Sequence, residues 1–259
     1  VVAADAGGQA RGAEDCRLNL PRDRGTDAKK NEIKPWLRKE WVIPPDQSGA
    51  FVAAMEEVLD VYKRPYNPKN PVVCIDEMPK QLIQENRSEF TDSKGVVHYD
   101  TEYVRNGTTN VFMAVEPLAG KRFARIIDTK TRNDFAEFVA SVVAAYPGVP
   151  CITIVCDNLA THDAGSFYEA FAPEKAHALM EKVHFVHTPK HGSWLDMAEI
   201  ELSVLSRQNF QRRIGTVEEM REELDAWLAE RNATCAKIDW HFTTEDARIK
   251  LKRLYPVFC

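Results

Sequence analysis

Two short apolar runs, each ending in an aspartate, place the strongest constraint on the fold of this chain. Val72–Asp76 reads VVCID, and Cys151–Asp157 reads CITIVCD. Continuous apolar runs of this length are typical of strands buried on both faces of an α/β sheet. In such sheets, ligands bind beyond the carboxyl ends of the parallel strands. If the two strands are neighbours, Asp76 and Asp157 project into one site.

A third acid is expected on a helix over Asp196–Phe210, which follows the loop KHGSWLD. The candidates there are Asp196, Glu199 and Glu201. Apolar residues at steps of three and four predict the buried face of this helix, namely Met197, Ile200 and Val204. Asp196 and Glu199 share another face, and Glu201 points elsewhere. One turn of the helix can therefore aim Glu199 at the strand ends, with Asp196 beside it.

Three carboxylates at one sheet edge repel each other unless cations neutralise them. Carboxylate oxygens favour hard ions such as Mg²⁺ or Mn²⁺. A pair of such ions is the usual clamp for phosphodiester chemistry. A single aspartate at a strand end is more often a turn or cap residue. Two such strands followed by a helical glutamate favour a metal-dependent nuclease or transferase, with purely structural carboxylates as the alternative.

The remaining pattern predicts a mixed sheet flanked by helices. An amphipathic helix is expected over Phe51–Tyr62, and another over Arg132–Tyr146 with Thr131 as its N-cap. Antiparallel strands joined by turns at Asn106-Gly107 and Ala119-Gly120 are expected between the two acids. Further elements are a strand over Val183–His187, a short helix over His162–Phe171, and helices over Val217–Asn232 and Thr244–Leu254.

Three parts of the chain differ in composition. Residues 1–28 are rich in Gly, Ala, Asp and Arg without a sustained period, which predicts a disordered or atypical segment. Residues 29–70 carry an extended arm with Trp36, Lys39 and Trp41, the first amphipathic helix and a proline-rich linker. Residues 71–259 form the α/β domain.

The net charge of −5 taken alone argues against a nucleic-acid binder, because phosphate contacts need Lys and Arg. A carboxylate site, however, adds negative charge that bound metals offset. Basic residues also gather locally, with a solvated face as the alternative for each cluster. These clusters are Lys29–Lys39, Lys121–Arg125, Arg207–Arg213 and Arg248–Arg253.

The six cysteines include no CxxC pair, so buried, reduced thiols are favoured over zinc ligands. This usage predicts a cytoplasmic compartment. No apolar run approaches the roughly 18 residues of a membrane span.

Several segments together resemble a known family. The runs VVCIDEMPKQL, CDNLATHDAG and HGSWLDMAEIELSVLSRQ look like the three catalytic segments of bacterial insertion-sequence transposases of the insertion-sequence-630 type, in the mariner-like superfamily. The similarity runs from about Lys29 to the C-terminus and includes NEIKPWLRKEW and WHFTTEDARIKLKRLYP. Agreement over so many segments is more specific than any single motif.

This resemblance implies an RNase H-like α/β fold with an Asp-Asp-Glu triad and two Mg²⁺ or Mn²⁺ ions. The triad matches Asp76, Asp157 and Glu199, which would hold the metals and catalyse strand cleavage and strand transfer. The family's Leu-Asn-x-x-Glu pattern has Asp196 in place of Asn here. The resemblance also implies element-end and target DNA as substrates, a homodimer, and a bacterial, nucleoid-associated location.

Residues around the acids are candidates for DNA contacts. Asn158 and His162 follow the second acid, and Lys190 and His191 precede the third. A cap or loop hydrogen bond is the alternative for the first two. Glu77, next to Asp76, is expected to face away from the metals because successive strand residues point to opposite faces. Basic residues after the catalytic helix are candidate contacts to the DNA backbone, with a solvated face as the alternative, namely Arg207, Arg212 and Arg213.

Two rival functions stay open. The first is an RNase H-like nuclease without strand transfer. The second is a catalytically inactive or truncated transposase-derived protein for DNA binding or assembly, because residues 1–28 show no helix-turn-helix pattern. Retention of all three acids argues against the second.

Overall fold

The computed structural model describes residues 46–87, 89–98 and 101–257. The arm with Trp36 and Trp41, and the expected disorder of residues 1–28, lie outside these residues. Five strands form one sheet in the order β5-β4-β1-β6-β7. The strands are β1 (Val72–Glu85), β4 (Tyr103–Glu116), β5 (Lys121–Ile127), β6 (Ile152–Cys156) and β7 (Val183–His187). The expected mixed sheet is confirmed, because β4 runs antiparallel to β1 and β5 whereas β6 runs parallel to β1 and β7.

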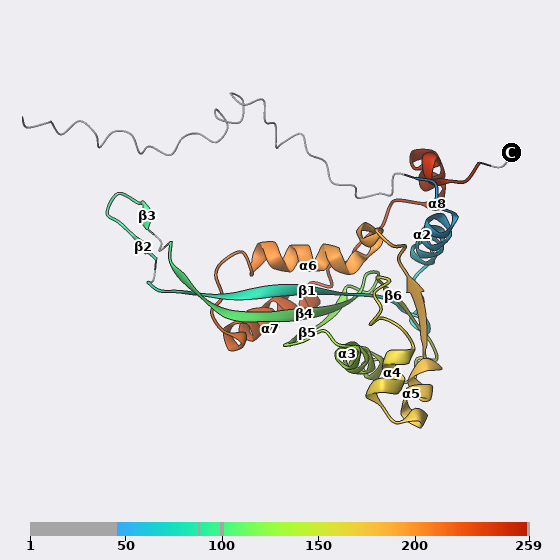
Figure 1. The fold of residues 1–259 in the computed structure, drawn as a ribbon, viewed down its shortest axis with the longest axis horizontal. Helices are drawn as coiled ribbons and strands as arrows, with labels where there is room; N and C mark the ends of the chain where they lie inside the picture. The colour runs from blue at the N-terminus through green and yellow to red at the C-terminus, as the bar shows by residue number, and fades with distance from the viewer. Residues whose placement is uncertain (1–45, 88, 99–100, 258–259) are drawn as a thin grey trace, which may run out of the picture. The chain divides into compact units, whose positions relative to one another are not determined.

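Helices cover both faces of the sheet (Figure 1). One face packs against α3 (Arg132–Ala144), with α4 (Gly165–Ala170) and α5 (Pro173–Met180) beside it. The other face packs against four helices, α2 (Gly49–Tyr62), α6 (Met197–Gln208), α7 (Val217–Ala233) and α8 (Thr244–Lys250). Short 3₁₀ turns lie at Ser193–Leu195 and Lys252–Leu254. None of the helices in the described ranges is long and apolar enough to cross a bilayer.

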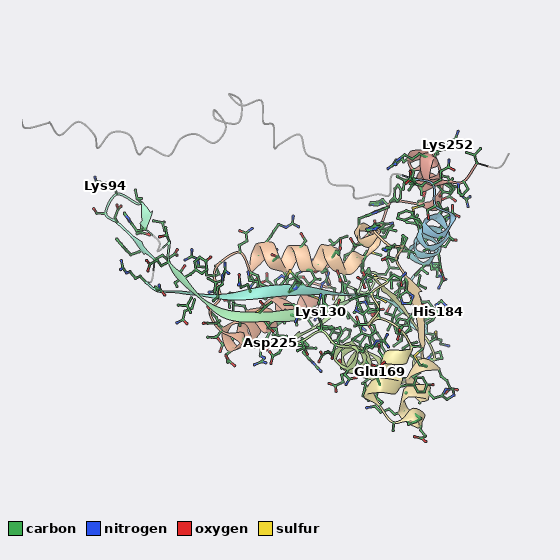
Figure 2. The ribbon with its side chains drawn as sticks, viewed as in Figure 1. Lys94, Lys130, Glu169, His184, Asp225 and Lys252 are labelled. Atoms are coloured by element: carbon green, nitrogen blue, oxygen red, sulfur yellow. The ribbon has the colours of Figure 1, made fainter. Side chains whose placement is uncertain are left out.

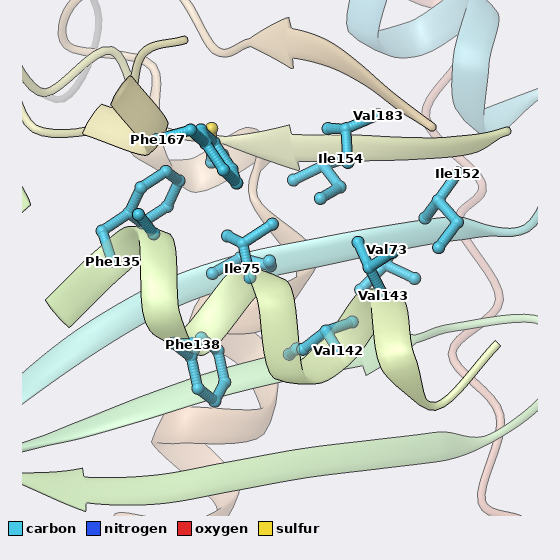
Figure 3. Packing of buried hydrophobic residues seen from close by; sticks show 14 of the residues in the cluster. Val73, Ile75, Phe135, Phe138, Val142, Val143, Ile152, Ile154, Phe167 and Val183 are labelled. Atoms are coloured by element: carbon cyan, nitrogen blue, oxygen red, sulfur yellow. The ribbon is translucent and has the colours of Figure 1, made fainter. Parts of the chain in front are cut away.

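The period of two in the strands divides the core into two layers. Val73 and Ile75 of β1 point toward α3, where Phe135 and Phe138 meet them (Figure 3). Cys74, between them, points to the opposite layer with α2 and the start of α6. Full burial of a large apolar side chain contributes about 1.5–3 kcal/mol relative to exposure. The two-sided burial of the first residues of β1 therefore fixes which face each following residue takes, including Asp76.

Local capping explains where two of the helices begin. Thr131 accepts a hydrogen bond from the backbone of Asp134, whose side chain bonds back to Thr131, which completes a capping box. Thr243 and Asp246 do the same at α8. The expected N-cap at Thr131 is thus confirmed. The expected helix over residues 51–62 is also present, and it begins two residues earlier at Gly49, after Ser48 caps it.

The expected turn at Asn106-Gly107 is wrong, because both residues lie inside the single long strand β4. The register with β1 shifts between Gln81 and Ile83, so that β4 holds one extra residue there. Gly107 has a φ of 99°, which a glycine adopts without a steric penalty. The β1/β4 ribbon therefore continues past the sheet toward β2 (Phe90–Thr91) and β3 (Val97–His98), with Lys94 at its tip (Figure 2). The turn at Ala119-Gly120 is confirmed between β4 and β5.

Candidate functional site

Asp76 and Asp157 lie side by side, but the expectation that each ends a strand is wrong for Asp76, because β1 continues through it to Glu85. In the parallel pair of β1 and β6, Ile75 is the register partner of Cys156, and each acid is the next residue. Alternation puts Asp76 on the same face as Cys74, and Asp157 on the same face as Val155. Cys74 and Val155 belong to the layer that contains the start of α6. The expectation that the two strands are neighbours is therefore confirmed.

Asp76 is the more buried of the two. Its Oδ1 accepts the backbone N–H of Glu77 at 2.8 Å. Burial raises the pKa of Asp76 to about 7 against that hydrogen bond, and the charges of Glu77, Asp157 and Glu199 raise it further. Asp76, Asp157 and Glu199 therefore lie close enough for their charges to interact and form one acid cluster, whereas Glu77 acts on Asp76 from the opposite face of β1.

Asp196 adds a fourth carboxylate to this region. It is the N-cap of α6, and its Oδ1 accepts the backbone N–H of Ala198 at 2.8 Å. Only 1% of the residue is exposed, and Oδ2 has no hydrogen-bond partner among the residues that the structure describes. Burial, and then the charge of Asp76, raise the pKa of Asp196 well above its usual value. Glu199 lies in the first turn of the same helix and also acts on Asp196.

We expect Asp196→Asn to raise the free energy of unfolding of the metal-free protein at neutral pH. Asparagine can still cap Ala198 through its oxygen, and its amide removes a buried, unpaired carboxylate oxygen, which costs about 1–3 kcal/mol. Because the folded-state pKa of Asp196 is raised, ionisation of this carboxyl opposes folding at neutral pH. The gain should therefore be absent below the unfolded-state pKa, grow as the pH rises above it, and be full only above the raised folded-state pKa. Urea unfolding in EDTA at several pH values measures it, with exposed Asp225→Asn as the control. A variant less stable than the wild type at neutral pH would contradict this reading.

Glu201 has a structural partner rather than a place in the acid cluster. Its two carboxylate oxygens accept hydrogen bonds from Arg122 at 2.8 and 2.9 Å, and Arg231 adds a third at 2.8 Å. These contacts lower the pKa of Glu201 against the effect of burial. The expectation that Glu201 points away from Glu199 agrees with this arrangement.

The predicted buried face of α6 is partly wrong. Met197 is buried as expected, but Ile200 is 38% exposed and Val204 is only partly buried. The helix instead buries Glu201 and the leucines that follow it, Leu202 and Leu205. The cause is Arg122 of β5, which neutralises Glu201 and so allows a charged side chain on the inner face.

His162 bridges two acids. Its Nε2 lies 2.7 Å from Oε1 of Glu77, and its Nδ1 lies 2.5 Å from Oδ1 of Asp157. The second contact is a close ion pair whose N–H is poorly aligned with the oxygen. Burial alone would lower the pKa of His162, but the two carboxylates outweigh it and raise this pKa to about 9.

The burial of His162 decides between its two expected roles. The residue is 1% exposed, so this conformation offers its ring no contact with DNA. A loop contact is what the structure shows. Glu77 turns to the face opposite Asp76, as its place in the strand predicts. Its pairing with His162 was missed, because no sequence spacing signals a contact between residues 85 positions apart.

Three other DNA-contact candidates share one hollow of about 420 Å³. Asn158, Lys190 and His191 line it together with the start of α2. All three are exposed. His191 has a φ of 65°, a strained value for a residue other than glycine that aims the loop before α6. In the sequence, Asn158 directly follows Asp157, and Lys190 and His191 precede Glu199.

The basic residues after α6 are in different situations. Arg207 is exposed in the last turn of the helix. Arg212 is held by Glu219 and Glu223 at 2.5 and 2.8 Å. Arg213 lies 3.8 Å from Glu85 and over the ring of Tyr103. Of the three, only Arg207 lies on α6 itself.

The donor atoms of the acid cluster are of the kind that hard divalent cations bind. Carboxylate oxygens are the ligands of Mg²⁺ and Mn²⁺. Burial, and then neighbouring negative charges, raise the pKa values of Asp76 and Asp196, and Oδ2 of Asp196 has no partner among the described residues, so a cation there would relieve both effects. Within the described residues, no three acidic, histidine or cysteine side chains already stand close enough to hold an ion. The carboxylates therefore converge without forming a closed ligand shell.

The thiols near this region are ordinary core groups. Cys74 and Cys156 are free and buried, and Cys151 is partly exposed. Burial raises the pKa of Cys74 and of Cys156, which keeps both protonated. They pack as small apolar side chains, as the sequence predicts for these two.

Comparison with known proteins agrees with the geometry. The solved structures that share the fold include two paired-end complexes of the Mos1 mariner transposase. The complex with Mn has a TM-score of 0.54 and 14% identity, over 85% of this chain and 68% of that chain. The complex with Mg has a TM-score of 0.53 and 15% identity, over 90% of this chain and 72% of that chain. This likeness confirms the RNase H-like mixed sheet that the resemblance implies.

Sequence comparison places the chain in a family. No curated protein sequence matches it. The sequence model of the DDE superfamily endonucleases matches residues 71–221, which is more than half of the chain. The match includes Asp76, Asp157 and the helix that carries Glu199. The chain therefore belongs to the DDE superfamily endonucleases.

Proposed function

We propose that this chain is the catalytic domain of a DNA transposase of the insertion-sequence-630 type. It would cut a DNA strand at an element end and join the freed 3′-hydroxyl to target DNA. The observation that carries the proposal is the convergence of Asp76, Asp157 and Glu199 where the parallel pairing of β1 with β6 stops. Membership of the DDE superfamily endonucleases supports the same chemistry.

Asp76, Asp157 and Glu199 would hold two Mg²⁺ or Mn²⁺ ions. When bound, such ions activate the attacking oxygen and stabilise the leaving oxygen of a phosphodiester. The chain's own residues fix the carboxylates. Asp76 is tied to the backbone of Glu77, and Asp157 is tied to His162. The Mos1 complexes were crystallised with Mn and with Mg, which supports divalent metals for this chain as well.

DNA would approach over the hollow lined by Asn158, Lys190 and His191. Lys190 and His191 are exposed there, and a cationic lysine would meet a phosphate near the carboxylates. Arg207 extends from the same helix as Glu199 and would contact the flanking backbone. The two Mos1 structures are paired-end complexes, which supports element-end DNA as substrate and a homodimer as the working assembly.

A nuclease without strand transfer is the nearer alternative, because the same carboxylates serve both reactions. Supercoiled plasmid in Mg²⁺ or Mn²⁺ tests cleavage. Oligonucleotides carrying the inverted repeats that flank the gene, already cut at the 3′ end, test joining to a target plasmid. Joined products in both metals support a transposase. Nicking without joining supports the nuclease, and neither activity supports an inactive assembly protein.

A further inference from the structure

His162 is held more tightly than a loop side chain needs to be. Its ring is fully buried and stacks on Phe135, with ring centroids 4.3 Å apart. Its backbone carbonyl contacts Nε2 of His187 at 2.7 Å. The ring thus lies fixed between Glu77 of β1 and Asp157 at the end of β6. Glu77, only 7% exposed, faces the α3 layer and has no place in the acid cluster on the other face.

The bridge determines which oxygen Asp157 can present. Oδ1 faces Nδ1 of His162 at 2.5 Å and accepts the backbone N–H of Leu159 at 3.3 Å. Oδ2 of Asp157 has no such partner among the described residues, and the charge of Asp157 acts on Asp76 and Asp196. Asp76 is similar, since its Oδ1 accepts the N–H of Glu77. Each of the two aspartates therefore has one oxygen bound within the chain and one oxygen that is not.

The number of oxygens that a carboxylate offers discriminates between cations. Ca²⁺ takes six to eight oxygens in flexible geometry and commonly binds both oxygens of one carboxylate. Mg²⁺ demands near-ideal octahedral geometry and is served by carboxylates that give one oxygen each. A carboxylate that is prevented from turning both oxygens to the metal disfavours Ca²⁺.

We propose that His162 is a positioning residue whose contact with Asp157 confines that aspartate to one metal-facing oxygen and so favours Mg²⁺ and Mn²⁺ over Ca²⁺. This inference rests on the proposed metal-binding role of Asp157. His162 acts through Asp157 and touches neither metal nor DNA. A ring that only filled space beside Phe135 would have no effect on the choice of cation.

Two substitutions separate the two contacts of the ring. In His162→Asn, the amide nitrogen takes the place of Nδ1 and keeps the contact with Asp157, while the contact with Glu77 is lost. In His162→Gln, the amide nitrogen takes the place of Nε2 and keeps the contact with Glu77, while the contact with Asp157 is lost. Both remove the aromatic ring from Phe135, so any loss of packing is shared.

Isothermal titration of the whole chain with Mn²⁺ and with Ca²⁺ gives the ratio of their two Kd values. We expect His162→Asn to keep the wild-type preference for Mn²⁺. We expect His162→Gln to reduce it roughly tenfold, because losing a contact to a metal ligand costs about 10- to 100-fold in affinity, and this loss falls on Mn²⁺ while Ca²⁺ can use the freed second oxygen. Equal ratios in both variants would overturn the proposal, whether both match the wild type or both shift. Thermal unfolding of each variant without metal reports the shared loss of packing.

Asp157→Asn distinguishes failure of this inference from failure of the proposed function. If Asp157→Asn binds Mn²⁺ as the wild type does, the metal assignment of Asp157 is wrong and the inference falls with it. If Asp157→Asn loses Mn²⁺ while His162→Gln keeps the wild-type ratio, the metal site stands and only the positioning role is overturned.

Discussion

Asp157→Asn should lower the rate of metal-dependent DNA nicking by about a thousandfold. Asp157 lies beside Asp76 where the parallel pairing of β1 with β6 stops, and under the proposed function a neutral amide there would weaken the hold on a cation that stabilises the transition state. Such stabilisation is worth several kcal/mol, and each 1.36 kcal/mol is a factor of about ten in rate. Single-turnover nicking of supercoiled plasmid, in Mg²⁺ and in Mn²⁺, measures the change.

The chain offers a matched control for this experiment. Asp128 also follows a strand, β5, but it is exposed and does not act on the carboxylates of the cluster. Asp128→Asn should nick at the wild-type rate. Nicking by Asp157→Asn within a few-fold of the wild type would remove Asp157 from the reaction. The same comparison for Glu199→Gln tests the role of Glu199. Glu201→Gln is not a suitable control, because it would remove the buried partner of Arg122 and so lower stability.

The second large effect concerns stability. Arg122→Ala should lower the free energy of unfolding by about 3–5 kcal/mol, the usual cost of leaving one partner of a buried ion pair uncompensated. The Arg122 side chain is 0% exposed and that of Glu201 is 1% exposed. Arg122 also donates to the backbone carbonyls of Gly120 and Ala236. Urea unfolding monitored by circular dichroism measures the loss.

Two further variants serve as a control and a rescue for Arg122→Ala. Lys121→Ala, at the exposed neighbour on β5, should change stability by less than about 1 kcal/mol. The double variant Arg122→Met, Glu201→Leu should recover much of the loss, because it leaves no unpaired charge beyond the partly exposed Arg231. If Arg122→Ala unfolds like the wild type, the buried pair does not hold α6 on the sheet.

This ion pair links stability to the site. Glu201 is two residues after Glu199 on α6, so the contact of Glu201 with Arg122 fixes the rotation of the helix. Asp196 fixes the start of the same helix as its N-cap. Glu199 lies between these two residues on α6, close enough for its charge to act on Asp76. A structural carboxylate and a capping carboxylate therefore position the candidate catalytic one.

The sequence predicted the parts of the site that depend on local periodicity. The continuous apolar runs placed Asp76 and Asp157 on two buried strands, which the structure pairs. Helical spacing put Glu199 and Glu201 on different faces of the helix. It failed where distant residues decide the outcome. Glu201 is buried because Arg122, 79 positions away, neutralises it. The pairing of Glu77 with His162 has the same character, since neither residue type nor spacing signals it.

The bulge in β4 is an instructive failure of a local rule. Asn-Gly between two apolar segments is a strong hairpin signal. Here Gly107 lies within a strand because pairing with β1 extends through it to Tyr103 and Glu85. The long-range ladder outweighs the turn preference of two residues. The ribbon that results carries exposed apolar residues, Tyr103 and Val104, away from the core.

The measurement that tests the central claim most directly is anomalous diffraction from crystals of this chain grown or soaked in Mn²⁺. The claim is that Asp76, Asp157 and Glu199 form a divalent-metal site. The account predicts anomalous peaks bounded by these three side chains, absent from crystals of Asp157→Asn treated in the same way. Peaks confined to other carboxylates, or peaks at the site that persist in Asp157→Asn, would contradict it.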